Sequence, residues 1–470
     1  MKIRLKVGGC AGFAGDRYDA ALAVAQTLAN EDGPRFLVFE TLAERTLALS
    51  QDPSARAARQ RMMLKRLSVV LPLCMASGIK IVGNFGSWTP HETASAIADL
   101  CNTLDCAQPK VAVVTGDDLI GKVPVDVLKT LPGDAEHEDF NRLISANAYL
   151  GAFPIAEAFD HGADIVVTGR IADPALVLGP MIHTLQLAPN HWDALACGTL
   201  AGHLIECGGQ VSGGYFADPV TKPVPNLAWI GFPIVDITDD FICHLRKPEN
   251  TGGCITRQTV IEQLLYEIHD PAAYLTPDVV LDLSQVTVTE CGQDKVLVSS
   301  PKGLPKPDSL KTTLCFEAGW YGETEISYAG LHADSRGLLA IEVIRERAAM
   351  LFPDLPLRCD LVGVSSVFAS NVGMAPPDDP EWLGISHDVR VRVATFSDDK
   401  AQVAALCADV EALYTNGPAG GGGVRIQLTP RITTGSVMVP ASSITTQIAM
   451  YCNGKAIEIS PVRQEAICHD

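Results

Sequence analysis

Short apolar runs alternate with longer stretches of helical period through the first half of the chain. The apolar runs are KIRLKV (2–7), FLVFE (36–40), IKIVGNFG (79–86), KVAVVTGDD (110–118) and DIVVTGRIADP (164–174). Buried strands that alternate with helices are typical of a parallel sheet covered by helices on both faces. The pattern therefore predicts an α/β domain over residues 1–230, with candidate site loops at its strand ends.

The pattern changes near residues 216–236, where prolines interrupt any helical period. Strand-like runs follow, and the C-terminal third has a clearer order. A strand ending near Tyr328 is followed by a helix, two strands, a second helix and a strand at 424–430. The order βαββαβ is that of the ferredoxin-like module. We therefore predict an α+β domain over residues 231–470 that contains this module.

Composition narrows the class of protein. The 470 residues carry 36 Lys plus Arg and 55 Asp plus Glu, a net charge of −19, and 47% are hydrophobic. This apolar content excludes a disordered chain, and the acidic balance argues against nucleic acid or a membrane surface as a partner. The longest apolar stretch, residues 67–79, is too short to span a membrane. We expect a cytoplasmic protein and, because only 19% of residues are charged, a homo-oligomer with an apolar interface.

Polar residues follow the predicted strands, which is where parallel α/β sheets bind their ligands. The loop after the first strand holds Gly15, Asp16 and Arg17. It forms either a cradle for an anion or simply a tight turn, and Asp16 can equally cap the next helix. Asn84 follows the third strand and is a further candidate for substrate binding.

Two later strand ends carry charged side chains. Asp117 and Asp118 can bind Mg²⁺ or share a proton for acid–base chemistry, or they can satisfy free amides at a helix N-terminus. Arg170 can clamp a carboxylate through two hydrogen bonds, or it can pair only with Asp173. We predict that Arg170 binds a substrate carboxylate or phosphate, and Asp173 is a further candidate for substrate binding.

Glycine pairs mark three further segments. In ECGGQVSGGYFADP (206–219), Glu206 is a candidate general acid or base. Paired glycines either let a ligand approach the backbone closely or form helix caps and turns. The candidate ligand-binding residues of these segments are Gly209, Gln210, Gly213, Gly214, Gly252, Gly253, Gly421 and Gly422. We expect the main pocket at the strand ends, walled by residues 206–215 and 251–253.

Several of these strings occur together in one protein family. The set is GFAGDR (12–17), VVTGDD (113–118), VVTGRIADP (166–174), ECGGQVSGGYFADP (206–219) and NGPAGGGG (416–423). With these strings the chain resembles the acyclic terpene utilisation AtuA family. The resemblance implies a role in the catabolism of small acids or their CoA thioesters. It also implies a small partner subunit, because some relatives carry or pair with an extra domain that has an RSGDKG-like string.

The residues and the resemblance together favour an enzyme. We expect a hydro-lyase, a hydratase or dehydratase, that acts on a small unsaturated or hydroxylated carboxylic acid or its CoA thioester. Asp117, Asp118 and Glu206 are its candidate catalytic groups. Two alternatives stay open: a metal-dependent hydrolase that holds Mg²⁺ on Asp117 and Asp118, and a non-catalytic subunit of a catabolic enzyme complex.

Overall fold

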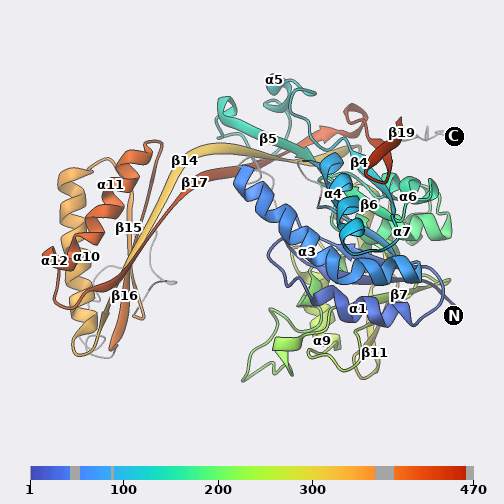
Figure 1. Cartoon of the computed structure of the whole chain (residues 1–470), viewed down its shortest axis with the longest axis horizontal. Coiled ribbons are helices and arrows are strands. Elements are labelled where there is room, and N and C mark those ends of the chain that lie inside the picture. Colours follow the sequence, from blue (N-terminus) through green and yellow to red (C-terminus); the bar gives the residue numbers. More distant parts are fainter. Residues whose placement is uncertain (1, 43–52, 86–88, 365, 367–385, 462–470) are drawn as a thin grey trace. The chain divides into compact units, whose positions relative to one another are not determined.

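The computed structural model describes residues 2–42, 53–85, 89–364, 366 and 386–461 (Figure 1). These residues belong to two compact units. Unit 1 is drawn from residues 1–138, 145–314 and 434–470, and unit 2 from residues 139–144 and 315–433. Two long strands, β14 (Ser309–Ala329) and β17 (Gly422–Pro440), run from one unit into the other. The domain boundary predicted near residue 230 falls inside unit 1.

The large sheet of unit 1 has the strand order β11-β12-β8-β7-β1-β2-β3-β6-β4-β18-β19 among the described residues. The central strands are β1 (Ile3–Ala11), β2 (Arg35–Phe39), β3 (Lys80–Gly83), β6 (Ile165–Thr168) and β4 (Lys110–Thr115). They are parallel to one another, as the sequence predicts. Of the predicted strand 79–86, residue 86 lies outside the described residues.

Antiparallel strands extend this parallel centre on both sides. On one side lie β7 (Ile234–Thr238), β8 (Cys243–Arg246), β12 (Lys295–Ser299) and β11 (Thr287–Gly292). On the other side lie β18 (Gln447–Cys452) and β19 (Lys455–Pro461). Because β7 pairs directly with β1, the segment after residue 230 continues the same sheet.

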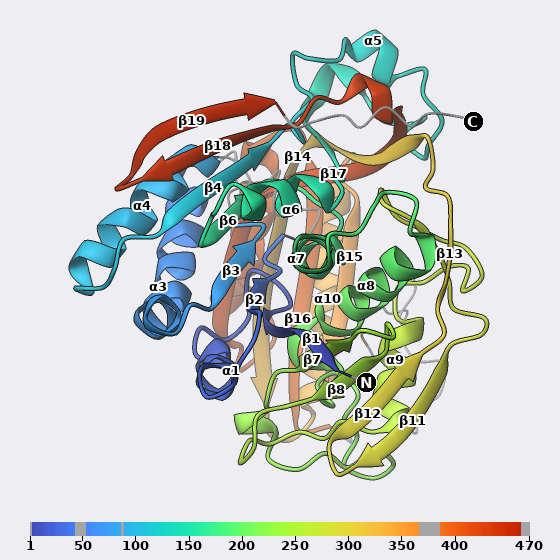
Figure 2. The same ribbon diagram turned by 90° about the vertical axis from the view of Figure 1, so that its right-hand side faces the viewer.

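Helices cover both faces of the parallel strands (Figure 2). One face packs against α1 (Ala20–Ala29), α3 (Pro53–Ser77) and α4 (Pro90–Thr103), and the other faces α6 (Phe153–Asp160), α7 (Ala175–Leu185) and α8 (Trp192–Ile205). Successive side chains of a strand point to opposite faces of the sheet. Leu37 of β2 lies in the core with α1 and α3, whereas Phe36 packs edge-on against Phe159 of α6. The prediction of an α/β fold with helices on both faces is confirmed.

Unit 2 combines β14, α10 (Ala333–Leu351), β15 (Leu357–Val362), β16 (Asp388–Ser397), α11 (Lys400–Glu411), α12 (Leu413–Asn416) and β17. Its sheet has the order β15-β16-β14-β17. Alternate residues of β16, such as Val391 and Val393, are buried in a core that includes α10. The intervening Arg392 lies on the opposite face of the sheet and carries a network of ion pairs. The assignment of unit 2 to the ferredoxin-like class stays a prediction.

Candidate functional site

The carboxyl ends of the parallel strands lie at one edge of the unit 1 sheet. Polar residues follow each of them: Asp16 after β1, Glu40 after β2, Asn84 after β3, Arg170 after β6 and Asp117 after β4. Because the strands are parallel, this edge gathers side chains that are far apart in the sequence. Hydrogen bonds connect Asn84 with Glu40, and the backbone of Arg170 with Asp117.

Glu40 and Asn84 form a buried hydrogen-bonded group. Asn84 Nδ2 donates to Glu40 Oε1 at 2.8 Å, and the Leu42 backbone N–H donates to the same oxygen at 2.7 Å. Asn84 Oδ1 accepts from the backbone N–H of Thr41 at 2.7 Å. Burial raises the pKa of Glu40 well above its usual value, and the charge of Asp173 raises it further, against the lowering effects of Arg170 and Asn84. This edge of the sheet therefore holds a carboxyl group that keeps its proton well above the ordinary pKa of glutamate.

Arg170 lies beside this group and is 3% exposed. Its NH1 donates to the Leu42 carbonyl at 2.6 Å, its NH2 lies 3.3 Å from Asp173 Oδ1, and its guanidinium carbon lies 4.0 Å from the centre of the Tyr149 ring. Among the described residues, Nε has no hydrogen-bond acceptor. Burial lowers the pKa of Arg170, but the charges of Asp173, Tyr149 and Glu40 outweigh it and the net pKa is raised. The ion pair with Asp173 that the sequence allowed as an alternative is present, although it is long.

Asp117 and Asp118 differ from the paired carboxylates that a metal site requires. Asp117 Oδ2 accepts from Asn147 Nδ2 at 3.0 Å and from the Arg170 backbone N–H at 2.8 Å. Asp118 Oδ1 accepts from the Ile120 backbone N–H at 3.0 Å. No group of three or more His, Cys, Asp or Glu side chains within the described residues could hold a metal ion. The bonding of Asp117 does not fit Mg²⁺, because its Oδ2 already accepts hydrogen bonds from two N–H groups.

Asp117 instead positions the loop that carries Arg170. A Cβ atom on Gly169 would come within 2.3 Å of Asp117 Oδ1, so the carboxylate packs directly against a backbone position that only glycine allows. Burial raises the pKa of Asp117, while the hydrogen bonds from Arg170 and Asn147 act in the opposite sense. The structure thus brings Asp117 and Arg170 together, with Asp117 bonded to the backbone of Arg170.

Glu206 pairs with a histidine one turn earlier in the chain. His203 lies in α8 and is 1% exposed, and its Nδ1 is 2.9 Å from Glu206 Oε1. Neither His203 Nε2 nor Glu206 Oε2 has a hydrogen-bond partner among the described residues. Burial lowers the pKa of His203, but the Glu206 charge outweighs it and the net pKa is raised. The sequence indicates this contact only through the spacing of His203 and Glu206, because residues three positions apart share one face of a helix.

Tyr274 links this pair to the Arg170 group. Its ring, in β9 (Tyr274–Leu275), lies 5.5 Å from the His203 ring. Burial raises the pKa of Tyr274 well above its usual value, and the charges of Glu206 and Asp173 raise it further. Glu206 and Asp173 are therefore both within electrostatic reach of one phenol. Burial and the Glu206 charge raise the pKa of the Cys207 thiol, which disfavours the nucleophilic thiolate form.

The loop after β1 binds its own aspartate. Asp16 Oδ2 accepts from the Gly12 backbone N–H at 2.9 Å, and Oδ1 accepts from the Arg17 N–H at 2.8 Å. The sequence left two possibilities for this loop, an anion cradle or a tight turn, and in the structure these amides donate to the carboxylate of Asp16. Asp16 does not cap α1, whose N-cap residue is Asp19. The Arg17 side chain points elsewhere: it donates to the Ala228 carbonyl at 3.0 Å and stacks over Trp229.

The glycine pairs let chain segments approach each other. A Cβ atom on Gly252 would lie 2.0 Å from the Asn226 carbonyl oxygen, too close for any side chain. Helix α9 (Arg257–Leu265) begins after Thr256, whose side chain accepts from the Thr259 N–H, so Gly252 and Gly253 precede the helix and do not form its N-terminus. Neighbouring chain segments likewise surround Gly209, Gly213, Gly214 and Gly253. Gly15 packs against Phe13. Gln210 is the last residue of the short helix η2 (Gly208–Gln210). Gly421 and Gly422 belong to unit 2, where an added Cβ would meet Tyr328 at the first and nothing within 4 Å at the second.

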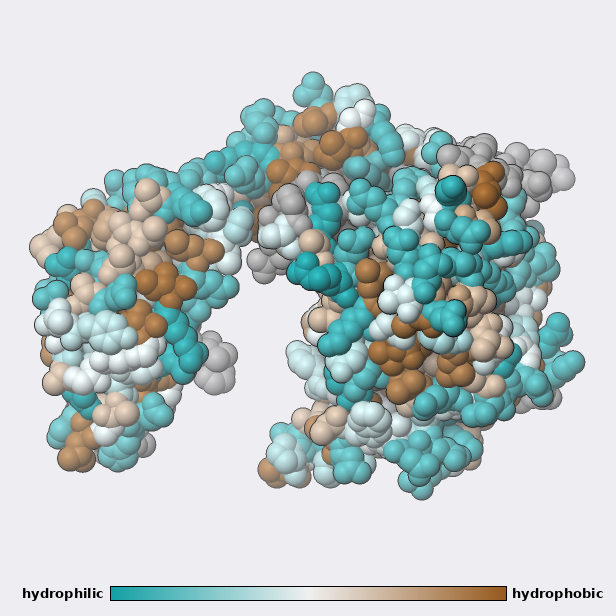
Figure 3. All heavy atoms as spheres, viewed as in Figure 1, coloured by the Kyte–Doolittle hydropathy of each residue, from teal (hydrophilic) through white to brown (hydrophobic). Residues whose placement is uncertain are grey.

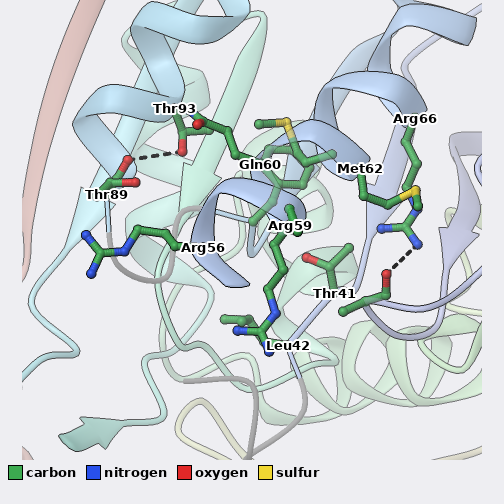
Figure 4. Close-up of a pocket in the computed structure, with 13 residues that line it drawn as sticks. Thr41, Leu42, Arg56, Arg59, Gln60, Met62, Arg66, Thr89 and Thr93 are labelled. Carbon is green, nitrogen blue, oxygen red and sulfur yellow. Dashed lines mark hydrogen bonds between the residues drawn. The ribbon is translucent and has the colours of Figure 1, made fainter. Parts of the chain in front are cut away.

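A pocket of about 220 Å³ lies at the carboxyl ends of β2 and β3, under helix α3 (Figure 4). Its lining residues are Ala14, Thr41, Leu42, Arg56, Ala58, Arg59, Gln60, Met62, Met63, Arg66, Phe85, Thr89 and Thr93. The pocket therefore lies at the predicted edge of the sheet. Its walls are α3 and α4 rather than residues 206–215 and 251–253, because the glycine-rich segments pack against chain instead of enclosing this space.

Comparison with known proteins identifies one family. Neither a curated protein nor a solved structure matches the chain. Across the described residues, no helix is both long enough and apolar enough to cross a membrane. The model of the acyclic terpene utilisation family protein AtuA matches residues 5–450, nearly the whole sequence. By this match the chain belongs to the acyclic terpene utilisation AtuA family.

Proposed function

We propose that the chain is a hydro-lyase that adds water to, or removes it from, a small unsaturated or hydroxylated carboxylic acid or its CoA thioester. The observation that carries this proposal is a buried guanidinium beside a buried carboxyl group at one strand-end edge. Arg170 is 3% exposed and Glu40 is 5% exposed, and the charge of each shifts the pKa of the other. A cation and a proton donor in one place suit the chemistry of an acid substrate.

In this proposal Arg170 binds the carboxylate or the thioester oxygen of the substrate. Its guanidinium stays charged and offers a planar fork that matches two oxygens. The 3.3 Å contact with Asp173 is longer than the roughly 2.7–2.9 Å of a charge-assisted hydrogen bond, so a substrate oxygen can compete for the same nitrogen. Contact with the Tyr149 ring holds the plane of the guanidinium in place.

Proton transfer in this proposal uses two groups. Dehydration removes a proton from one carbon and a hydroxyl group from the next, and the hydroxyl leaves as water after it receives a proton. Glu40, whose raised pKa favours the protonated form, is the proposed acid. The pair formed by Glu206 and His203 is the proposed base, since Glu206 holds Nδ1 and leaves Nε2 to accept a proton. In hydration the two roles reverse.

The test is turnover by the purified chain in D₂O. Fumarate, mesaconate, crotonate and crotonyl-CoA are incubated with the protein and followed by proton NMR. We expect water addition, or at least exchange of a carbon-bound proton for deuterium, with one of them. Loss of that reaction in Arg170→Lys and its retention in Arg392→Lys would support the assignment. Absence of both reactions with every substrate would overturn it.

The two alternatives predict different results in the same assay. A metal-dependent hydrolase would release free thiol from crotonyl-CoA and lose that activity with EDTA, although the bonding of Asp117 does not favour it. A non-catalytic subunit would show no turnover alone and would gain it on addition of a separate small subunit. A small partner subunit is part of this alternative, because the family resemblance implies one.

We further propose that the protein works in the cytoplasm as a homo-oligomer. Apolar side chains reach the surface of unit 1, including Tyr215 and Val220, which are 89% and 87% exposed. On the face that carries α1 and α3, hydrophobic residues are visible among hydrophilic ones (Figure 3). Multi-angle light scattering at micromolar concentration should give a mass above 50.0 kDa, and a monomer would contradict the proposal.

A further inference from the structure

A buried aspartate outside the strand-end edge holds residues 149–152. Asp278 lies in the turn between β9 and β10 (Val280–Asp282) and is 4% exposed. The backbone N–H of Ala152 donates to both of its carboxyl oxygens at 2.9 Å. A Cβ atom on Gly151 would lie 2.4 Å from Asp278 Oδ1, so the carboxyl group packs directly against the backbone of this segment. The segment is therefore fixed by a side chain that is distant in the sequence.

Residues 149–152 lie directly against the loop that carries Arg170. Leu150 forms a parallel β-bridge to this loop, and its carbonyl accepts from the Ala172 backbone N–H at 2.9 Å. The guanidinium carbon of Arg170 lies 4.0 Å from the centre of the Tyr149 ring. A shift of residues 149–152 would therefore move both the backbone beside Arg170 and the ring against its side chain.

Asp278 makes the same kind of contact to this segment as Asp117 makes to the Arg170 loop. Asp117 Oδ1 would lie 2.3 Å from a Cβ atom on Gly169, and Oδ2 accepts from the backbone N–H of the next residue, Arg170. Asp278 likewise packs against a glycine and accepts from the N–H of the residue that follows it. One buried carboxyl group thus fixes the Arg170 loop, and a second fixes the segment that packs against that loop.

We propose that Asp278 is a positioning residue for Arg170 and acts through residues 149–152. This inference rests on the proposed function only for the role of Arg170 toward substrate. Residues that support a binding group from behind keep that group in its productive geometry. The simpler role of Asp278 is to cap helix α6, and in that role its loss would leave the Arg170 loop unaffected.

The test measures hydrogen–deuterium exchange of the full chain by mass spectrometry, in peptides that cover residues 147–153 and 169–173. Asp278→Ala removes the acceptor of the Ala152 N–H, so we expect exchange in both peptides to accelerate about tenfold or more. Asp278→Asn keeps an acceptor oxygen and should retain the protection of both peptides. Acceleration confined to residues 147–153 would overturn the proposal, and so would an Asp278→Asn variant that exchanges as fast as Asp278→Ala.

Two further variants separate a local effect from a general one. Gly151→Ala places a Cβ atom against Asp278 Oδ1 and should accelerate exchange in the same two peptides. Asp282→Ala removes a nearby carboxylate that accepts from the Ser284 N–H at 2.7 Å, and it should leave both peptides unchanged. Equal effects of Asp278→Ala and Asp282→Ala would overturn the proposal, as would acceleration spread evenly over unit 1.

The pH dependence of exchange distinguishes the carboxyl group from a side chain that only fills space. Burial raises the pKa of Asp278 to about 6, while the hydrogen bond from Ala152 and the charge of Lys306, in the segment before β14, act to lower it. Because the unfolded-state pKa is near 3.9, the contribution of the protonated group is fully present below about pH 3.9 and is lost as pH rises through about 6.

Protection of residues 147–153, corrected for the intrinsic pH dependence of amide exchange, should therefore fall in wild type as pH rises through about 6. In Asp278→Asn it should stay constant, because the amide does not titrate. The same pH dependence in both proteins would overturn the role of the carboxyl group.

The exchange experiment is independent of turnover. Should the hydro-lyase assay fail while Asp278→Ala accelerates exchange in both peptides, the positioning role stands and the proposed reaction is wrong. If a reaction is found, Asp278→Ala should lower kcat/KM about tenfold and Asp278→Asn should restore it. Accelerated exchange at residues 169–173 with unchanged kcat/KM would leave the positioning role in place and remove Arg170 from the proposed reaction.

Discussion

Two arginines, Arg170 of unit 1 and Arg392 of unit 2, show how differently one residue type is used in this chain. Arg392 NH1 donates to Asp360 at 2.9 Å, and its NH2 donates to the Tyr321 hydroxyl at 2.7 Å and also to Glu323. Its side chain is 26% exposed. Arg170 is buried, with a backbone carbonyl as its closest acceptor and a carboxylate at 3.3 Å. A raised pKa is common to both, so the pKa alone does not distinguish them.

What distinguishes them is how completely the charge is matched. Arg392 lies among carboxylates of neighbouring strands, on the face of the sheet opposite to the α10 core, a pattern expected of structural ion pairs. Arg170 is withdrawn from water beside Glu40, a carboxyl group whose pKa is raised chiefly by burial. Burial of a polar charged group is unfavourable unless it is well paired, so the Arg170 Nε, which has no acceptor among the described residues, is the feature that points to a ligand.

Glu40→Gln should have the largest effect on turnover. Glutamine keeps the oxygen that accepts from Asn84 and Leu42, but it cannot supply a proton. We expect kcat to fall by about 10²–10⁴-fold, as is typical when a general acid is removed. Glu323→Gln, beside Arg392, is the matched control and should leave kcat unchanged. Similar kcat values for both variants would remove the functional distinction between the two regions.

Arg170→Lys should have the next largest effect. Lysine retains the positive charge and loses the planar fork, so we expect kcat/KM to fall about ten- to a hundred-fold, or roughly 1.5–3 kcal/mol. The hydrogen bond to the Leu42 carbonyl and the contact with Tyr149 also change, and the melting temperature should decrease by a few degrees. A lowered melting temperature with normal kcat/KM would identify Arg170 as purely structural.

Glu40 and Glu323 should make the stability of the fold depend on pH in opposite directions. Burial is the main cause of the raised folded-state pKa of Glu40. The protonated side chain therefore contributes fully to stability below the unfolded-state pKa near 4.3, and this contribution is lost as pH rises through the folded-state pKa. Burial raises the pKa of Glu323, but its hydrogen bonds with Arg392 and Tyr321 outweigh this and lower the net value. The contribution of ionised Glu323 to the stability of the fold is therefore present above about pH 4.3, and it is lost as pH falls through the folded-state pKa.

Denaturation of Glu40→Gln and Glu323→Gln across pH 3–8 measures this contrast. Relative to wild type, Glu40→Gln should gain stability toward high pH, and Glu323→Gln should lose stability there and approach wild type in acid. If the stability differences of both variants from wild type changed with pH in the same direction, the predicted contrast between Glu40 and Glu323 would be wrong.

Arg392→Lys should have the smallest effect. Lysine can still pair with Glu323 or Asp360 but not with both sides of the network, and the site is partly exposed. We expect a loss of up to about 1 kcal/mol in the free energy of unfolding and an unchanged kcat/KM. Urea denaturation together with the turnover assay provides both values, and a loss of turnover would extend the functional region to unit 2.

Local sequence patterns were enough to predict the buried strands of this molecule and the polar residues at their ends. Apolar runs followed directly by Asp117 or Arg170 indicated buried parallel strands with polar ends, and the structure confirms those strands. Contacts between distant segments were not accessible in this way. The pair of His203 with Glu206 has a helical spacing, but its link to Tyr274 joins segments about seventy residues apart. Arg17 looked like a site residue, yet it packs against Trp229, over two hundred residues later.

The order of the strands in the unit 1 sheet has a consequence for the time course of synthesis. β18 pairs with β4, so that Ile448 lies opposite Val114, and all of unit 2 is translated between these two strands. Until β18 emerges from the ribosome, β4 presents an unpaired strand edge, which is a template for association with other chains. The nascent protein therefore passes through a long interval in which its central sheet is open on one side, and this interval is where we expect chaperones to matter most.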